Sequence, residues 1–454
     1  WYTTTESHGY NTTIIERSIK MSITKKRSLR QIFAGILCMG ILITGAQPCA
    51  AAAYGYDEYG DPIVTATPVP DSQSGQAAQV TPAHSSYYNQ AADTDSIDGW
   101  PTGPNIEAQA AVLMDVNTEA VLYSKNADTR LYPASITKIM TTLLACENLS
   151  SKDNIVVSEN ASTSVTAGDS SIYAAPGEEF TRNQALMAVM LQSANEMSVA
   201  VAEQVSGSVK KFTELMNWRA KLFGCKNTHF NNPNGLPDEN HYTTASDMAR
   251  IAKSAWLNPL YRKFCTRRYY EIPATNKFAE ARQLLNHHKM IKNGEYYYEG
   301  VLGGKTGYTD ASGNTLVTYC KRGNMTLVAV ILNSTSAANA YSDTASLFNY
   351  GFENFEKVDM KVSMNPVPFK VLPCDKYILK DNGNTYPFYY KTKVYVTLPK
   401  GIKKSKLNKR QAVLSNAAGP LRLKSKYYYN KHLVGWGMQY ERNVVSDLLL
   451  QTSS

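Results

Sequence analysis

The chain has 454 residues, of which 43% are hydrophobic and 19% are charged. This composition is typical of a globular protein and excludes an intrinsically disordered one, and the length has room for about two or three domains. The seven cysteines contain no C-x-x-C pair and the seven histidines no H-E-x-x-H pattern, so the sequence indicates neither a disulfide framework nor a metal site. We expect no metal and no cofactor.

The segment that begins at Met21 has the order of a secretory signal peptide. Lys25, Lys26 and Arg27 form a basic start, residues 32–46 are apolar, and residues 50–53 are small. The apolar run is shorter than the roughly 20 residues of a membrane span, which favours cleavage over a retained anchor. We therefore predict a signal peptide over residues 21–52 and an exported protein; residues 1–20 resemble no targeting element.

Export bears on the choice of partner. The formal net charge is +9, which would hold an exported protein near the polyanionic envelope of a cell wall or at the outer face of the cytoplasmic membrane. Nucleic acid is excluded as a partner because export removes the protein from it. A charged surface without a specific partner is the alternative.

The rest of the chain divides by composition and periodicity. Residues 53–104 are rich in Ala, Ser, Gln, Pro, Asp and Tyr, contain no Lys or Arg and show no period, so we predict a disordered linker. Residues 105–355 form the main predicted domain. Residues 356–454 carry alternating runs such as 394–398 and predict a small β-rich domain.

Within the main domain the predicted elements change from strands to helices and back. Residues 110–115 and 120–124 read as a hairpin, followed by a helix that starts at Ser135. Residues 185–205, 209–223 and 244–255 have a helical period and form a mainly helical insertion. Residues 315–320 and 326–333 read as a second hairpin, and residues 343–352 as a last helix that packs on the sheet.

Three short motifs occur in a fixed order along this domain. They are Ser135-Ile136-Thr137-Lys138, Ser193-Ala194-Asn195 and Lys305-Thr306-Gly307. Each is weak alone, since S-x-x-K also occurs at Ser22 and Ser208, but K-T-G occurs once. The triple S-x-x-K, S-x-N, K-T-G is typical of serine enzymes that acylate themselves on peptidoglycan stems or β-lactams. A phosphate-binding loop is excluded because Glu299 stands where its first glycine belongs.

The residue chemistry supports a serine nucleophile. A serine at a helix start has an unpaired backbone N–H, and the positive end of the helix dipole faces a developing oxyanion. Lys138 returns to the same helical face, so its amine can reach the Ser135 hydroxyl. To act as a base the amine must be neutral, which burial and the like charge of Lys305 would favour. We expect Gly303, Gly304 and Gly307 to let substrate backbone approach closely.

From about residue 105 to residue 355 the sequence resembles the D-alanyl-D-alanine carboxypeptidases, the low-molecular-weight penicillin-binding proteins. Beyond the three motifs, the resemblance lies in the blocks at residues 132–138, 191–196, 227–236, 241–245 and 304–310. It implies an α+β catalytic domain of the penicillin-binding-protein and β-lactamase type, with an antiparallel sheet flanked by helices plus a helical subdomain. The part after Val358 is weakly similar to the family's small β-rich C-terminal domain.

The resemblance also implies a function and a role for each site residue. The substrates would be stem peptides ending in D-Ala-D-Ala, and β-lactams would be covalent inhibitors; peripheral membrane contact is a further expectation. The expected catalytic residues are the nucleophile Ser135, the base Lys138 and the proton relay Ser193. The expected substrate-binding residues are Asn195 for the acyl-side amide, Lys305, Thr306 and Thr309 for the terminal carboxylate, and Gly307 and Tyr308. The backbone N–H groups of Ser135 and Tyr308 would form the oxyanion hole.

The sequence departs from the family at one place. Where the family has a carboxylate-binding arginine before the last helix, this chain has Ala340. Recognition of the carboxylate would then rest on Lys305, Thr306 and Thr309, or on an arginine from elsewhere, for which Arg250, Arg267 and Arg268 are the candidates.

Two alternatives to the peptidase remain. A class A β-lactamase is disfavoured because no E-x-x-x-N pattern between Asn195 and Lys305 supplies its deacylating glutamate. A catalytically weak wall-binding structural protein would have no reason to retain the complete triple of motifs.

Overall fold

The computed structural model describes residues 84–363, 365, 367–370, 385–414 and 422–441. The predicted signal peptide and the first part of the predicted linker lie outside these residues. Within the described part, no helix is both long enough and apolar enough to cross a membrane.

The centre of the catalytic domain is a five-stranded antiparallel sheet in the order β2-β1-β9-β8-β7. Its strands are β1 (Ala110–Asp115), β2 (Val121–Lys125), β7 (Val301–Thr309), β8 (Gly313–Arg322) and β9 (Met325–Ser334). Strands β7, β8 and β9 form a meander, and the hairpin β1–β2 joins it because β1 pairs with β9. This order leaves β7, which carries the K-T-G motif, at an edge of the sheet.

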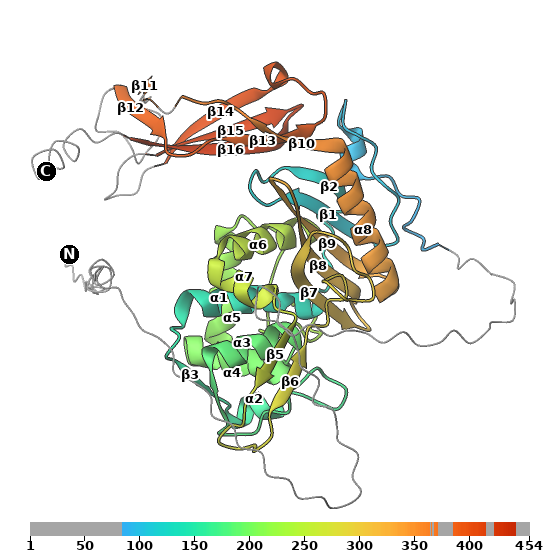
Figure 1. Cartoon of the computed structure of the whole chain (residues 1–454), viewed down its shortest axis with the longest axis vertical. Coiled ribbons are helices and arrows are strands. Elements are labelled where there is room, and N and C mark those ends of the chain that lie inside the picture. Colours follow the sequence, from blue (N-terminus) through green and yellow to red (C-terminus); the bar gives the residue numbers. More distant parts are fainter. Residues whose placement is uncertain (1–83, 364, 366, 371–384, 415–421, 442–454) are drawn as a thin grey trace, which may run out of the picture. The chain divides into compact units, whose positions relative to one another are not determined.

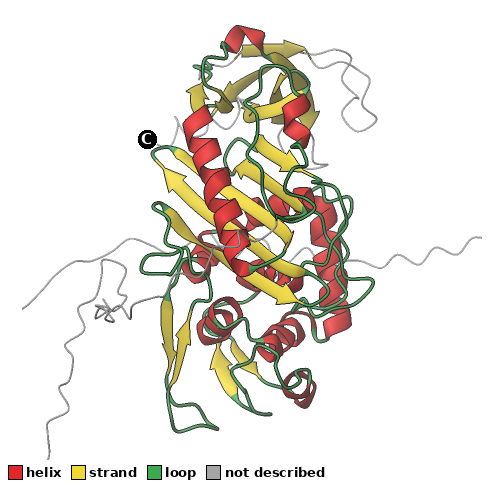
Figure 2. Ribbon diagram, turned by 90° about the vertical axis from the view of Figure 1, so that its right-hand side faces the viewer, coloured by secondary structure: helices red, strands yellow, loops and turns green. Residues whose placement is uncertain are grey.

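Helices cover both faces of this sheet (Figures 1 and 2). Helix α8 (Ala337–Asn354) packs on one face, and α6 (Ala245–Leu257) packs on the other face with α1 (Lys138–Asn148) beside it. Successive strand residues point to opposite faces. Val328 and Val330 therefore join the core under α6 and α1, while Leu327 and Ile331 join the core under α8. Because both faces are buried, β9 has an unbroken apolar run from Leu327 to Leu332 instead of an alternating pattern.

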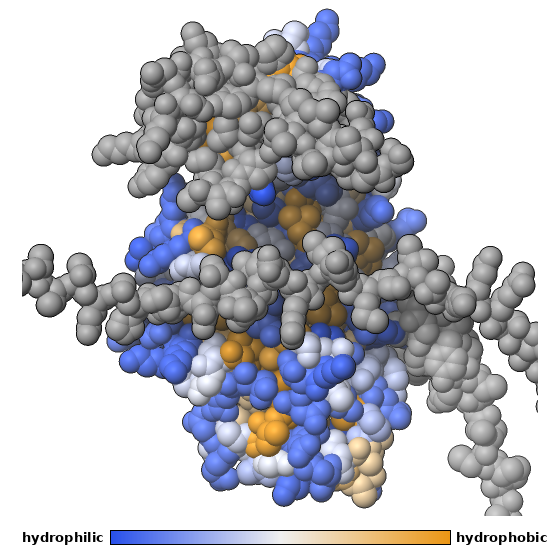
Figure 3. Space-filling model, turned by 90° about the vertical axis from the view of Figure 1, so that its left-hand side faces the viewer, coloured by the Kyte–Doolittle hydropathy of each residue, from blue (hydrophilic) through white to orange (hydrophobic). Residues whose placement is uncertain are grey.

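The helical subdomain lies between β2 and β7 in the sequence. It contains α2 (Glu159–Thr163), α3 (Arg182–Leu191), α4 (Asn195–Ser206), α5 (Val209–Leu222) and α7 (Pro259–Cys265). It also contains two small two-stranded sheets, β3 (Asn154–Val156) with β4 (Glu179–Thr181) and β5 (Tyr269–Ile272) with β6 (Arg282–Leu285). Thr181, Ser208 and Thr244 cap α3, α5 and α6 by accepting backbone N–H groups. On the face in Figure 3, hydrophobic residues of this subdomain form small separate patches among hydrophilic ones, as on an ordinary protein surface.

The C-terminal part is an antiparallel sheet of seven strands. They are β10 (Phe355–Asp359), β11 (Val367–Lys370), β12 (Thr385–Tyr390), β13 (Tyr395–Pro399), β14 (Asn408–Leu414), β15 (Arg422–Tyr429) and β16 (His432–Glu441); a short 3-10 turn, η3 (Lys404–Lys406), precedes β14. The predicted fold class, a helix-flanked antiparallel sheet with a helical subdomain and a separate β-rich part, is confirmed.

The linker prediction was wrong for its last part. Residues 84–104 contain the 3-10 turn η1 (Asp93–Ser96) and pack on the catalytic domain. Trp100 is buried, and its Nε1 donates to Leu122 O at 2.8 Å, while Tyr350 Oη donates to Pro101 O at 2.7 Å. These contacts are made by single residues of an irregular segment, so they leave no period in the sequence. The last helix is also longer than predicted, because Ser336 caps it and it starts at Ala337.

Candidate active site

Ser135 lies in a 3-10 turn, η2 (Ala134–Thr137), that leads directly into α1. Residues three apart eclipse one another in a 3-10 turn, so Lys138 returns over Ser135 and its Nζ lies 2.9 Å from Ser135 Oγ. The residue before the serine, Ala134, has φ of 51°. A non-glycine residue in this region stores strain of about 1–3 kcal/mol, which recurs at functional sites.

Lys138 is completely buried and is held by two further oxygens. Its Nζ donates to Asn195 Oδ1 at 2.7 Å and to Asn234 O at 2.6 Å. Burial, followed by the charge of Lys305, holds the pKa of Lys138 well below its ordinary value. A neutral amine has two hydrogens and one lone pair. The two carbonyl oxygens take the hydrogens, which leaves the lone pair for the Ser135 hydroxyl.

Ser193 lies in the short break between α3 and α4, where it has φ of 59°. The sequence predicted a helical period over residues 185–205, and the structure divides this stretch here into α3 and α4. The break brings Ser193 Oγ within 3.1 Å of Lys305 Nζ, which donates to it and to Thr306 O at 2.9 Å. Burial lowers the pKa of Lys305 to about 7. The three motifs therefore meet at two buried amines and two serine hydroxyls.

The glycines of β7 have different roles from those expected. A Cβ on Gly307 would lie 2.9 Å from Ser135 N and 2.4 Å from Thr315 Oγ1, so this glycine does keep space open beside the serine. A Cβ on Gly303 would instead meet Cys265 O at 2.2 Å, and one on Gly304 would meet Val317 O at 1.9 Å. The expectation that all three admit substrate was wrong for Gly303 and Gly304, which allow close packing inside the domain.

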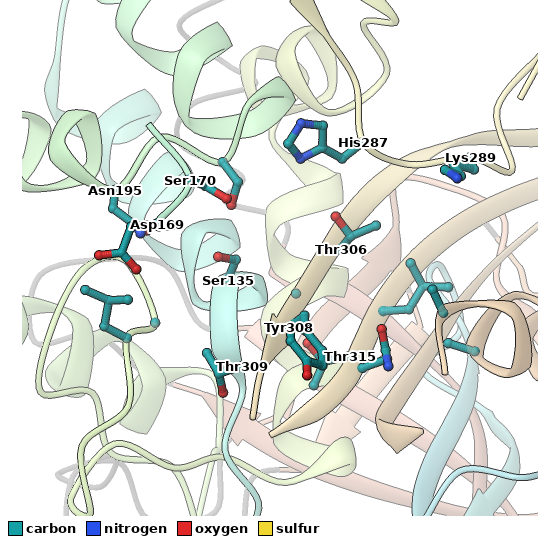
Figure 4. Close-up of a pocket in the computed structure, with 18 of the residues that line it drawn as sticks. Ser135, Asp169, Ser170, Asn195, His287, Lys289, Thr306, Tyr308, Thr309 and Thr315 are labelled. Atoms are coloured by element: carbon teal, nitrogen blue, oxygen red, sulfur yellow. The ribbon is translucent and has the colours of Figure 1, made fainter. Parts of the chain in front are cut away.

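A cleft of about 370 Å³ opens in front of Ser135. Figure 4 shows Ser135 between Asp169 and Asn195 on one side and Thr306 and Tyr308 of β7 on the other. Seven of the predicted site residues line the cleft: Ser135, Ser193, Asn195, Thr306, Gly307, Tyr308 and Thr309. The other two, Lys138 and Lys305, lie buried behind them within hydrogen-bond distance of the serines.

Sequence reasoning missed two segments of the cleft wall. Gly168, Asp169 and Ser170 line it from a loop whose Ser170 O accepts the backbone N–H of Asn195 at 2.9 Å. His287 lines it as well, and its Nε2 lies 2.8 Å from Gln192 Oε1. These residues come from irregular segments, and only the tertiary fold brings them to Ser135.

The arginines named as candidates to replace the missing one lie elsewhere. Ala340 does line the cleft, but it lies inside α8 rather than before it. None of Arg250, Arg267 and Arg268 is among the described lining residues, and Arg250 pairs with Asp247 at 2.9 Å. The lysine that lines the cleft is Lys289, whose Nζ pairs with Glu295 at 2.6 Å with both side chains more than half exposed. Its loop is fixed next to Ala340, because Lys289 N donates to Tyr341 Oη at 3.3 Å.

Comparison with known proteins agrees with this geometry. The sequence profile of peptidase family S11, described as D-alanyl-D-alanine carboxypeptidase, matches residues 99–336, just over half of the chain. The chain belongs to this family. The match includes all nine predicted site residues, so the resemblance that was inferred from the motifs is confirmed.

Individual relatives carry the same description. The chain is 39% identical to the D-alanyl-D-alanine carboxypeptidase DacF of Bacillus subtilis over 55% of this chain and 63% of the relative, a little under two thirds of its length. It is 29% identical to DacA of Escherichia coli over 66% of this chain and 73% of the relative. Among solved structures, penicillin binding protein 5 of Haemophilus influenzae superposes with a TM-score of 0.60 at 28% identity and covers 76% of this chain and 98% of its own. This likeness extends the shared fold beyond the catalytic domain.

Proposed function

We propose that this family member is a serine-type D-Ala-D-Ala carboxypeptidase that removes the terminal D-alanine from peptidoglycan stem peptides and is acylated by penicillins. The observation that carries the proposal is the buried Lys138 amine, which lies 2.9 Å from Ser135 Oγ and within hydrogen-bond distance of the carbonyl oxygens of Asn195 and Asn234. In its neutral form the amine can direct its two hydrogens to these carbonyl oxygens. Such an amine is an acceptor for the serine proton. A serine hydroxyl barely ionises at neutral pH and needs this help to act as a nucleophile.

Acylation would begin when Ser135 Oγ attacks the carbonyl carbon of the penultimate D-alanine. The serine proton passes to Lys138 Nζ as the bond forms. The oxyanion of the tetrahedral intermediate would accept hydrogen bonds from the backbone N–H groups of Ser135 and Tyr308. A side chain at Gly307 would crowd the Ser135 N–H, so the glycine leaves space for the oxyanion. Each such donor is worth about 3–4 kcal/mol in the transition state.

The leaving D-alanine needs a proton on its amine. Ser193 would deliver it, because Lys305 Nζ donates to Ser193 Oγ and the serine hydroxyl can pass on its own proton. The proton that Lys138 took from Ser135 then replaces the one that Ser193 gave up, so Lys138 is neutral again before deacylation. Expulsion of D-alanine leaves an ester on Ser135. Water then hydrolyses the ester, with the neutral Lys138 amine taking the proton of the water and returning it to the serine.

Strand β7 would hold the substrate. It is the edge strand of the sheet, and its free edge can pair with an extended peptide. Asn195 Oδ1 accepts a hydrogen bond from Lys138 Nζ, so the NH₂ group of Asn195 is left for the acyl-side amide of the peptide. Lys305, Thr306 and Thr309 attract the terminal carboxylate. We propose that the protein acts outside the cytoplasm, which the basic net charge and the signal-like segment at residues 21–52 support.

The family match favours this activity over the β-lactamase and the wall-binding structural protein. The test is release of D-alanine from a peptide ending in D-Ala-D-Ala, together with covalent labelling by a fluorescent penicillin. Ser135→Ala should abolish both. Ser208→Ala is the matched control, because Ser208 also begins an S-x-x-K sequence but caps α5, and it should retain both. Labelling that persists in Ser135→Ala, or that maps to Ser193, would overturn the assignment.

A further inference from the structure

The C-terminal sheet has two chemically different faces. In the pairing of β15 with β16, Leu423 and Tyr427 are buried with Val434 on one face. The alternate residues lie on the opposite face, where Arg422 pairs with Tyr440, Lys424 with Met438 and Lys426 with Trp436. Strand alternation therefore places a row of cations beside a row of large side chains.

Cations lie over the aromatic rings of this second face. Lys391 Nζ is 4.4 Å from the centre of the Tyr440 ring, and Lys424 Nζ is 4.4 Å from that of Trp436. Arg410 lies over Tyr428 at 5.2 Å. We call this surface the cationic aromatic face and define it by Lys391, Lys393, Arg410, Arg422, Lys424, Lys426, Tyr428, Trp436 and Tyr440.

Few acidic groups balance these charges. Asp359 lies 3.9 Å from Lys393, whose side chain is 70% exposed. Glu119, whose negative charge interacts with Lys424, is itself paired with Lys253 at 2.9 Å. Among the described residues, cations on this face therefore outnumber the carboxylates near it, and the face attracts anions.

A cavity of about 500 Å³ opens on this face. Lys391, Lys393, Trp436 and Tyr440 line it, together with polar groups that include Asn117, Asn324 and Thr392. Lys357 forms part of the wall and is already satisfied, because its Nζ donates to Asn324 O at 2.8 Å and to Asn117 Oδ1 at 3.2 Å. The exposed lysines at the rim are the charges that remain for a ligand.

We propose that the cationic aromatic face binds an anionic glycopolymer, a chain of sugar or polyol units that carry phosphate or carboxylate groups. The rim lysines pair with the anionic groups, the exposed parts of the rings contact the apolar parts of the sugar or polyol, and the wall amides and hydroxyls bond to its hydroxyls. An anionic membrane is the weaker fit, because the rings of Trp436 and Tyr440 are half-buried between cations rather than exposed for insertion. The site is separate from the Ser135 cleft and does not depend on the proposed peptidase activity.

The test is a binding titration of the full chain against four probes. They are poly(glycerol phosphate), polygalacturonate, neutral dextran, and vesicles that contain phosphatidylglycerol. Binding to at least one of the two anionic polymers is expected, with affinity that falls as salt is added, and none to dextran. The phosphate and carboxylate polymers show which anionic group is preferred. Tighter binding to the vesicles than to either polymer would overturn the proposal in favour of a membrane surface.

Variants of equal charge separate this face from general electrostatic attraction. The triple variant Lys391→Gln, Lys393→Gln, Lys424→Gln should weaken polymer binding at least about tenfold. The matched control removes three exposed lysines of α5, Lys210→Gln, Lys211→Gln and Lys221→Gln, and should leave binding nearly unchanged. Equal losses in the two triple variants would show that only net charge matters and would overturn the proposal. Unchanged D-alanine release would show that both variants are folded.

Discussion

The two lysines behind the serines differ in their surroundings, and this difference separates their roles. Lys138 meets two carbonyl oxygens and the Ser135 hydroxyl, whereas Lys305 meets the Ser193 hydroxyl and the carbonyl of Thr306. Burial lowers the pKa of both. A substrate carboxylate near Lys305 would favour its protonated form, and that charge would in turn keep Lys138 neutral.

The first prediction concerns the base. Acylation by penicillin should slow as the pH is lowered, because a protonated Lys138 has no lone pair for the serine proton, and the apparent pKa of this limb should lie below the roughly 10.4 of free lysine. Lys138→Arg should lower the acylation rate by about 10²–10⁴-fold, since arginine keeps its proton. Stopped-flow acylation across pH measures both. An active arginine variant would rule out the lysine base.

The second prediction concerns the substrate carboxylate. With Ala340 in the cleft wall, a D-Ala-D-Ala peptide should be preferred over its C-terminal amide by less than about tenfold, which is the low end for a charge-assisted hydrogen bond. Ala340→Arg should widen this ratio of kcat/KM values. If the ratio is already large, Lys289→Gln should reduce it and Glu295→Gln, which frees Lys289, should increase it. If the ratio of kcat/KM for the acid over the amide is large and Lys289→Gln leaves it unchanged, neither the missing arginine at position 340 nor Lys289 controls carboxylate recognition.

At the scale of elements, the sequence predicted what depends on periodicity. The hairpins β1–β2 and β8–β9 and the helices α5 and α6 were found because apolar residues recur at fixed spacing there. Short two-stranded sheets such as β5–β6 were missed, since four residues are too few to show a period. The loop of Asp169 and the segment of His287 were missed for the same reason, although both complete the cleft.

A buried lysine fastens the N-terminal segment to the edge of the sheet. Lys125 on β2 is 1% exposed, and its Nζ donates to Tyr87 O at 2.6 Å and to Ile106 O at 2.9 Å. The segment that was predicted to be a linker thus depends on a side chain 38 residues away in the sequence. No local pattern could show this contact.

The third prediction follows from this fastening. Lys125→Met keeps the apolar stem but leaves both carbonyls without their donor, so it should lower the free energy of unfolding by about 2–4 kcal/mol. Lys152→Met, at an exposed position, is the control and should cost little. Denaturant unfolding followed by circular dichroism gives both values. If the two variants are equally stable, residues 84–107 do not depend on Lys125.

At the scale of the whole molecule, the motifs predicted which side chains meet at the cleft, because the proposed chemistry requires particular residue types. They could not predict which contacts join the catalytic domain to the C-terminal sheet. These contacts include Thr118 and Asp115 at the β1–β2 turn, which meet Thr397 of β13, and His432, whose Nε2 donates to Val121 O at 2.6 Å. Single polar residues make them, and each is compatible with many other partners.

The last prediction tests this junction. Thr397 is completely buried, its Oγ1 donates to Asp115 Oδ2 at 2.9 Å, and Thr118 Oγ1 lies 2.8 Å from it. Thr397→Val keeps the shape but removes a donor from a buried carboxylate, so it should lower the free energy of unfolding by about 1.5–3 kcal/mol. Thr397→Ser restores the hydroxyl and should recover most of that loss. Because the junction is remote from Ser135, the rate of D-alanine release should not change in either variant. A valine variant as stable as the parent would mean that this hydroxyl does not hold the two sheets together, and a valine variant with slower D-alanine release would mean that the junction acts on the cleft.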